Sequence, residues 1–183
     1  MLTDSEVIQL VGANRRDEAL AEILRAYRRK VFGLAYSFVR NRETAEDVAQ
    51  EVFIKVWRAL PAFDARASLS TWIYTITRNT SLSALRDKRS SGKLEDASAQ
   101  GTEPAIEPST GSATAEVAAE NASLLRLVAR LPDKQRQVIL LFYMQEQSHQ
   151  EVATMLAMPV GTVKTLLHRA RASLAAAAGA SDP

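Results

Sequence analysis

Cysteine is absent from the 183 residues of this chain. Its absence excludes disulfides, zinc sites built on thiolates and cysteine nucleophiles, and it fits a reducing compartment. Long apolar runs are also missing, so no segment is expected to span a bilayer. The first ten residues carry Asp4 and Glu6 and lack the basic-then-apolar order of a signal peptide. We therefore expect a cytoplasmic protein that does not insert into a membrane.

Charge is distributed unevenly along the chain. Residues 1–90 hold 15 basic and 11 acidic side chains, residues 91–120 hold one and six, and residues 121–183 hold seven and four. The two basic blocks can supply phosphate contacts, although an ordinary solvated surface has the same pattern. The acidic segment has almost no large apolar residue. Folding it would therefore bury too little apolar surface to compensate for the conformational entropy that it would lose. We predict two modules, residues 1–90 and 120–183, joined by a flexible acidic linker over residues 91–119.

Apolar residues recur at three- and four-residue spacing in both modules, which predicts an all-α protein of two small helical domains. In the first module we expect one helix to end at Asn41 and a second to open with a capping box at Thr44. Ser68 or Ser70 is expected to cap a third helix. In the second module Ser148 is expected to open a short helix with a capping box of its own. No segment alternates apolar and polar residues for long enough to predict a strand.

The C-terminal module has the pattern of a helix-turn-helix. A tight connection over residues 157–159 separates a short helix from a longer one that begins at about Val160. Val163 and Leu167 face inward on the second helix, and its other face is basic. A basic, exposed second helix is the geometry that enters a major groove. A helical hairpin with a solvated basic face has the same periodicity, so the pattern alone leaves DNA binding open.

The residues in this pattern resemble region 4 of the extracytoplasmic-function (ECF) sigma factors, which belong to the sigma-70 family of RNA polymerase sigma factors. The resemblance rests on Leu131-Pro132, on Gln150-Glu151-Val152-Ala153, on the run from Pro159 to Lys164, and on His168-Arg169-Ala170-Arg171. It implies that this helix-turn-helix binds the upstream (−35) promoter element through Val160, Gly161, Thr162, Lys164, Thr165, His168, Arg169 and Arg171. Leu166 departs from the family, which commonly has arginine there, and it lies between the core stripe and the DNA face.

A second resemblance is carried by residues 46–57, whose sequence is EDVAQEVFIKVW. They resemble sigma region 2.2, which docks on the coiled coil of the polymerase β′ clamp. Helical spacing independently places Asp47, Gln50, Glu51 and Ile54 on one side of the helix, away from its valine stripe. An apolar side chain among carboxylates and an amide suits a basic partner helix. Without the resemblance, a solvated acidic face would be the commoner interpretation.

A third resemblance runs from Phe63 to Tyr74 and on to Arg78-Asn79. This stretch resembles regions 2.3 and 2.4, which open and bind the downstream (−10) element. Melted DNA is recognised through flipped or stacked bases, which requires a pocket, aromatic faces and amide hydrogen bonds. The resemblance implies contacts to this element by Asp64, Arg66, Ser68, Tyr74, Arg78, Asn79, Arg86, Lys88 and Arg89. Trp72 is interpreted as core, and the role of Tyr74 is left open.

Together the resemblances imply a sigma factor that binds core RNA polymerase, at its β′ clamp and β flap, and directs recognition and melting of promoter DNA. No catalytic residue, metal site or cofactor is expected. The family's usual control implies an anti-sigma factor as a further partner. Candidate apolar anchors for that partner are Ile54, Leu166 and the pair Phe142-Tyr143.

Two other functions fit parts of the sequence. The carboxylates between Glu43 and Glu51 could belong to an all-α magnesium-dependent pyrophosphohydrolase. Such a site needs a second acidic pair on a facing helix, and residues 69–86 hold no carboxylate. A conventional helix-turn-helix repressor with a sensor domain would bind closed duplex DNA without polymerase. That alternative leaves the acidic helix face and the Arg78-Asn79 helix unexplained.

Overall fold

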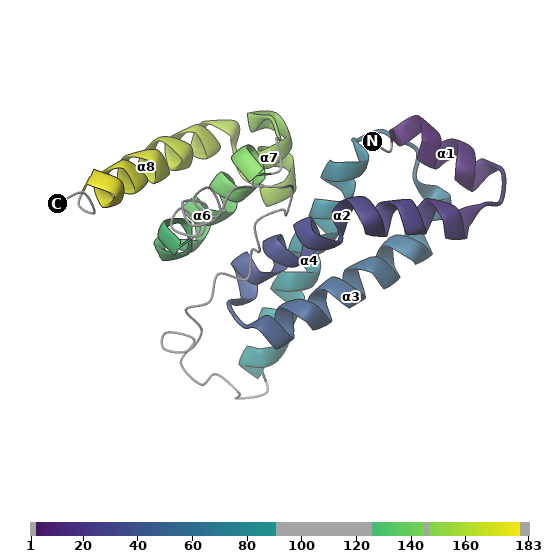
Figure 1. Cartoon of the computed structure of the whole chain (residues 1–183), viewed down its shortest axis with the longest axis horizontal. Helices are drawn as coiled ribbons and strands as arrows, with labels where there is room; N and C mark the ends of the chain where they lie inside the picture. Colours follow the sequence, from purple (N-terminus) through teal and green to yellow (C-terminus); the bar gives the residue numbers. More distant parts are fainter. Residues whose placement is uncertain (1–2, 91–125, 145–146, 180–183) are drawn as a thin grey trace, which may run out of the picture. The chain divides into compact units, whose positions relative to one another are not determined.

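The computed structural model describes residues 3–90, 126–144 and 147–179 (Figure 1). Across these ranges the regular elements are all helices and no strand occurs, so the predicted all-α fold is confirmed. Two compact units make up the chain: one holds the helices before residue 91, and the other holds most of the residues after it. The linker predicted over residues 91–119 lies outside the described residues, and the module boundaries at residues 90 and 120 stay predictions.

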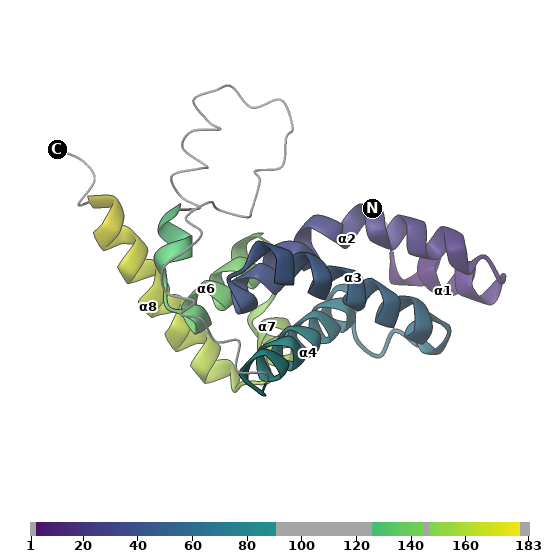
Figure 2. The same cartoon turned by 90° about the horizontal axis from the view of Figure 1, so that it is seen from below.

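The first unit is a helical bundle. Its elements are α1 (Asp4–Gly12), α2 (Arg16–Val39), α3 (Arg42–Ala59), the short 3₁₀ helix η1 (Leu60–Ala62) and α4 (Leu69–Ser90). Figures 1 and 2 show α2, α3 and α4 side by side, with α1 folded back beside the N-terminal part of α2. The fully buried apolar side chains between them include Val7, Ile23, Val31, Val52, Val56, Leu60, Leu69 and Ile73. Burial of these side chains is the main favourable contribution to the stability of the bundle.

The connection between α2 and α3 corrects two of the predicted helix boundaries. Arg40, with a left-handed φ of 52°, ends α2. Asn41 is not the end of that helix but the N-cap of α3, because its side-chain oxygen accepts from the Thr44 amide at 2.8 Å. The capping box predicted at Thr44 is therefore wrong, and α3 begins at Arg42. Both side chains can cap a helix, but Asn41 comes first along the chain and has the extended backbone that a cap requires.

The second unit holds a helical stretch at residues 126–130, followed by α6 (Asp133–Ile139), the π-helical turn η2 (Leu140–Met144), α7 (His149–Leu156) and α8 (Val160–Gly179). The capping box predicted at Ser148 is confirmed. The Glu151 amide donates to the Ser148 hydroxyl at 3.2 Å, and the Ser148 amide donates to the Glu151 carboxylate at 2.9 Å. Helix α8 begins at Val160, as the turn pattern predicted, and it packs against α6.

Neither a membrane-spanning helix nor a metal cluster occurs in the part of the chain that the structure describes. None of its helices combines the length and the apolar character that a bilayer crossing requires. Nor do three or more His, Asp or Glu side chains of these residues gather in a way that could hold a metal ion.

Candidate DNA and polymerase interfaces

One face of α3 carries side chains that the bundle core does not use. Valines 48, 52 and 56 are buried, whereas Asp47, Gln50 and Ile54 are exposed. Glu51 is half-buried beside them and pairs with Lys55, whose Nζ lies 3.5 Å from the carboxylate. Ile54 is 44% exposed, and few other large apolar side chains are as accessible among the described residues. Helix α3 therefore presents the four predicted docking residues on one surface.

The chain between α3 and α4, residues 60–68, is called the α3–α4 loop here. It contains Asp64, Arg66 and Ser68, three of the residues predicted for the −10 element. The Arg66 amide donates to Asp64 Oδ1 at 3.2 Å, and Arg66 Nε lies 2.9 Å from Asp64 Oδ2. Ala65, between them, has a positive φ of 54°, a conformation that costs an L-residue about 1–2 kcal/mol. The loop therefore presents a charged pair on a strained, exposed turn.

Ser68 marks the end of the α3–α4 loop and the start of α4. Its hydroxyl accepts from the Thr71 amide at 3.2 Å, so Ser68, and not Ser70, is the residue that caps this helix. Before it, the Phe63 ring packs on Trp72 with centroids 5.1 Å apart. Trp72 is half-buried, so it lies at the edge of the core and not fully within it.

Tyr74 lies in the core of the bundle and is not on the surface that the loop presents. It is 1% exposed, and its ring meets Tyr27 of α2 edge-on at 6.0 Å. Burial, together with Tyr27, raises the pKa of the Tyr74 phenol. In this conformation the ring cannot reach a DNA base, so of the two roles left open for Tyr74 the structure supports a place in the core.

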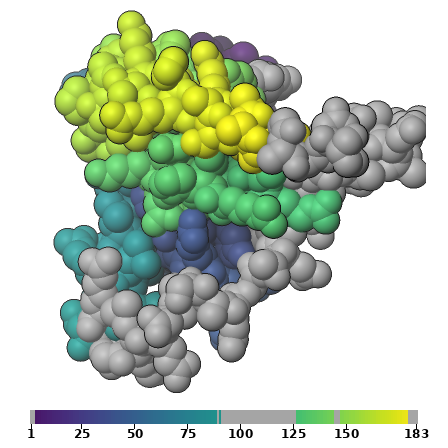
Figure 3. Space-filling model, turned by 90° about the vertical axis from the view of Figure 1, so that its left-hand side faces the viewer, coloured from purple at the N-terminus to yellow at the C-terminus, as the bar shows by residue number. Residues whose placement is uncertain are grey.

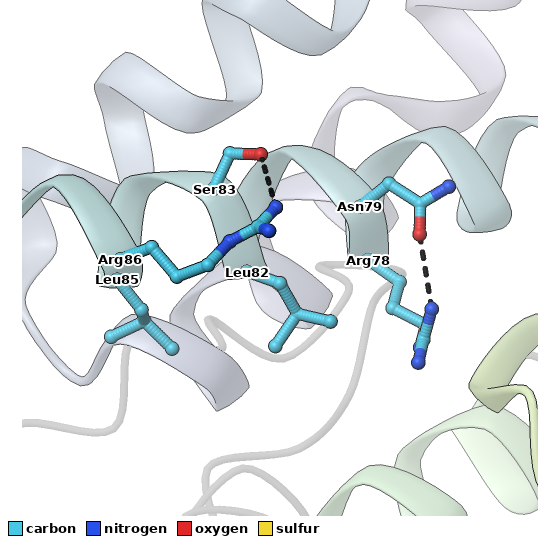
Figure 4. A pocket seen from close by; sticks show the side chains of 6 residues that line it. All are labelled: Arg78, Asn79, Leu82, Ser83, Leu85 and Arg86. Carbon is cyan, nitrogen blue, oxygen red and sulfur yellow. Dashed lines mark hydrogen bonds between the residues drawn. The ribbon is translucent and has the colours of Figure 1, made fainter.

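Further along α4, polar and apolar side chains line a shallow hollow, which Figure 4 shows in close-up. Arg78 donates to the Asn79 side-chain oxygen at 3.0 Å, and Arg86 donates to the Ser83 hydroxyl at 3.1 Å. Leu82 and Leu85 complete the lining, and Figure 4 shows them on the same side of the helix as Arg78. Two guanidinium groups beside two leucine side chains can accept a nucleotide through phosphate contacts and base packing.

The last turn of α4 holds the other predicted cations of this unit. Lys88 donates from Nζ to the Thr44 hydroxyl of α3 and so links the end of α4 to the start of α3. A phosphate contact by Lys88 would compete with this bond. The side chain of Arg89 lies outside the described residues.

The outer surface of α8 carries most of the residues predicted for the −35 element. Gly161, Thr162, Lys164, Thr165, His168 and Arg169 are exposed, and Val160 is half-buried. In the space-filling view of Figure 3, the C-terminal part of α8 lies on the surface beside α6. A Cβ atom added to Gly161 would meet nothing within 4 Å, so packing within the chain does not require glycine there.

Two side chains of α8 depart from a simple DNA-facing stripe. The Arg171 guanidinium lies over the Tyr143 ring of η2 at 5.3 Å and over Phe142 at 6.0 Å. Arg171 itself is exposed, so this packing restricts its guanidinium without burying it. Leu166 is half-buried, so it belongs fully neither to the core nor to the exposed face. Tyr143 is itself 50% exposed, which leaves an aromatic edge accessible beside α8.

Two residues that the sequence patterns did not single out contact the ends of the α3–α4 loop. Asp4 of α1 accepts the Leu69 amide on Oδ1 at 3.1 Å. Arg16 of α2 donates to the Trp57 carbonyl, and its guanidinium lies 3.8 Å from the centre of the Trp57 ring. Their partners are far away in the sequence, so no local signal predicts these contacts. The Thr3-x-x-Glu6 capping box of α1 was a local signal for the helix that carries Asp4.

Known proteins match both units. Residues 23–91 match the family described as Sigma-70 region 2, and residues 121–174 match the family described as Sigma-70, region 4. The ECF RNA polymerase sigma factor SigW of Bacillus subtilis is 37% identical over 167 residues, which cover 86% of this chain and 87% of SigW. The ECF RNA polymerase sigma factor RpoE of Cereibacter sphaeroides is 35% identical over 170 residues, with 92% and 91% covered.

Among solved structures, the sigma factor RpoE in complex with the anti-sigma factor NepR from Bartonella quintana has a TM-score of 0.64 with this chain. The match covers 84% of this chain and 92% of that one, at 23% identity. At this identity, the likeness supports the fold alone.

Proposed function

Because the chain belongs to the sigma-70 family, as an ECF-type RNA polymerase sigma factor, we propose that it binds core polymerase and directs initiation at promoters with two elements. The observation that carries the proposal is that matches to region 2 and region 4 follow one another on a single chain, in the order found in relatives of nearly the same length. Family members are initiation factors without catalysis of their own, so the chain is not an enzyme. We place its action in the cytoplasm, with the polymerase.

We assign the binding of core polymerase to one face of α3. This face is formed by Asp47, Gln50, Glu51 and Ile54. The carboxylates of Asp47 and Glu51 favour a basic partner electrostatically. Docking of that partner would bury the exposed side chain of Ile54. The partner proposed for this face is the coiled coil of the β′ clamp. The second unit is assigned a separate contact with the β flap.

The −10 element is assigned to the α3–α4 loop and the hollow on α4. Asp64, Arg66 and Ser68 provide hydrogen-bonding groups around one turn, as a pocket for a single flipped base requires. Arg78 and Asn79 continue the surface along α4, where Arg86 can hold phosphate. Tyr74 supports this surface from within the core and does not contact the DNA.

The −35 element is assigned to the exposed residues at the start and middle of α8. A helix N-terminus in the major groove brings backbone amides close to phosphate, and Gly161 leaves room for that approach. Lys164, Thr165 and Arg169 are the side chains proposed to reach the bases or the backbone. Arg171 packs on the aromatic rings of η2, so we propose that it contributes less to the DNA contacts than Lys164.

An anti-sigma factor is proposed as the controlling partner. A relative of this fold has been solved in complex with one. Ile54 in the first unit and Tyr143 in the second are exposed apolar side chains that such a partner could cover, and Leu166 and Phe142 in the second unit are half-buried. A pull-down of the full chain from uninduced cells tests this proposal. Recovery of polymerase alone would count against sequestration.

Run-off transcription tests the proposed function itself. The full chain and core polymerase are incubated with a library of duplexes in which the promoter region is randomised, and the transcripts are sequenced. We expect initiation at templates that share two elements, and no such selection by core polymerase alone. A repressor would enrich duplexes without polymerase and would start no transcript. Failure to initiate, with an active core and a control sigma factor, would contradict the proposal.

A further inference from the structure

We propose that residues 3–22, which precede the region 2 match, hold the α3–α4 loop at both of its ends and so position it for the −10 strand, with Asp4 and Arg16 as the positioning residues. The inference rests on the proposed function of that loop. Neither residue lies within the family match, which starts at residue 23. Neither is in the loop, so neither is expected to touch DNA.

Asp4 holds the end of the loop that leads into α4. Leu69 is the first residue of α4, and the amides of a helix's first turn have no partner within the helix. Ser68 satisfies the Thr71 amide from within the chain segment itself. The Leu69 amide is instead satisfied from outside, by Asp4 Oδ1 at 3.1 Å. The carboxylate also suits the positive end of the helix dipole.

Arg16 holds the other end of the loop, where α3 finishes. In an α-helix the Trp57 carbonyl would accept from the amide four residues later, but that residue is Pro61, which has no N–H. The Arg16 guanidinium supplies the missing donor and stacks on the Trp57 ring at 3.8 Å. At each end of the loop, one backbone group thus has no partner nearby in the sequence. Asp4 accepts the Leu69 amide, and Arg16 donates to the Trp57 carbonyl.

Stability alone does not explain Arg16. Its Nε is buried and has no acceptor among the described residues, which is an unfavourable arrangement that an apolar side chain of similar length would avoid. What the arginine adds is a directional bond to one carbonyl.

The tip of the loop, residues 64–67, is exposed to solvent. The Phe63 amide donates to the Leu60 carbonyl at 3.1 Å before this tip, and Ser68 caps α4 after it. Within the tip, Arg66 pairs with Asp64, and Ala65 keeps a strained, left-handed φ of 54°. A loop with free ends would have to be ordered when a strand binds, and that entropy would weaken binding. If both ends of the loop are already fixed in the free protein, less entropy is lost when the strand binds. We therefore assign the contacts of Asp4 and Arg16 a role in strand affinity beyond their role in folding.

The chain offers a matched control beside each residue. Glu6 lies on α1 close to Asp4, and its carboxylate is bonded to Thr3 in the capping box. Arg15 precedes Arg16 and pairs with the exposed Glu18. We expect loss of Glu6 or Arg15 to perturb the N-terminal segment while the Asp4 and Arg16 contacts with the loop ends remain.

The test uses full-length chain reconstituted with core polymerase. The probe is the fluorescent single strand that wild-type holoenzyme selects from a library with a randomised unpaired window. Asp4→Ala and Arg16→Met are each expected to weaken strand binding about threefold to tenfold, the effect of one hydrogen bond. Asp4→Asn keeps an acceptor oxygen and should retain most of the affinity. Glu6→Ala and Arg15→Ala should bind the strand like wild type. If Arg16→Met does not fold, Arg16→Lys, which keeps a donor without the planar stack, should show a smaller loss in the same assay.

Core affinity and amide exchange separate positioning from general destabilisation. Core affinity should be the same in all variants, and the Leu69 amide should exchange faster in Asp4→Ala than in Glu6→Ala. Wild-type strand affinity in Asp4→Ala and Arg16→Met, or a parallel loss of core affinity, would overturn the inference and leave the proposed function standing. If wild-type holoenzyme selects no strand, the proposed function of the loop fails, and this inference fails with it.

Discussion

Replacing Lys164 by glutamine tests which cations of α8 contact DNA phosphate. Lys164 is exposed, and the described residues include no ion-pair partner for it. Arg171, on the same helix, has its guanidinium 5.3 Å from the centre of the Tyr143 ring. We therefore expect Lys164→Gln to remove a phosphate contact and Arg171→Gln to remove a contact within the protein.

The two variants should differ in how their DNA affinity depends on salt. Each phosphate neutralised on duplex DNA contributes about 0.9 to the slope of log K against log salt. If Lys164 makes one such contact, wild type loses more affinity than Lys164→Gln as the salt concentration rises. From about 50 to 200 mM salt, the ratio of the two affinities should fall by about threefold. The free energy of unfolding of Lys164→Gln should stay within about 0.5 kcal/mol of wild type, because its side chain is exposed. Arg171→Gln should keep the slope and lose about 0.5–1 kcal/mol of stability with its cation–π contacts.

Fluorescence anisotropy of holoenzyme with a duplex selected by the wild type, measured at both salt concentrations, gives the slopes. Urea unfolding of the free chain gives the stabilities. An unchanged slope in Lys164→Gln would refute the assignment of this residue to phosphate. A larger slope change in Arg171→Gln than in Lys164→Gln would refute the argument that packing on the aromatic rings limits the contact of Arg171 with phosphate.

Three further predictions concern single positions in the first unit. Asp47→Lys should weaken binding to core polymerase without changing thermal unfolding, because the side chain is exposed on α3. Normal core binding by this variant would show that the face is not the docking surface. Asn41→Ala should lower the free energy of unfolding by about 1 kcal/mol, since the Thr44 amide loses its acceptor, and an unchanged urea midpoint would contradict the assigned cap. Ala65→Gly should raise the free energy of unfolding by about 0.5–1 kcal/mol, because glycine adopts a φ of 54° without strain, and a lower midpoint would argue against strain at this turn.

Helix boundaries could be predicted where the groups that define them are close in sequence. The Ser148–Glu151 box and the start of α8 at Val160 depend on residues within one helical turn, and both were predicted correctly. The start of α3 was not, because Asn41 and Thr44 are both good caps three residues apart. Local chemistry does not rank two such candidates. The backbone conformation that selects Asn41 follows from how α2 ends and α3 packs.

Helical periodicity was also enough to group the candidate contact residues. Asp47, Gln50 and Ile54 share a face of α3, and Lys164 and His168 lie on the exposed side of α8, because a period of 3.6 residues determines which side chains point the same way. The family resemblance then assigned partners to these faces.

The sequence by itself thus determined the all-α class, the starts of α7 and α8, the faces of α3 and α8 and the family. Only the tertiary structure decided which polar and aromatic groups are already engaged within the protein. Tyr74 is buried because Tyr27 packs on it from α2, and Lys88 is bonded to Thr44 of α3. The amide of Leu69 is bonded to Asp4, which is 65 residues away. Periodicity and capping are properties of neighbouring residues, whereas these contacts exist only after helices distant in sequence have packed together.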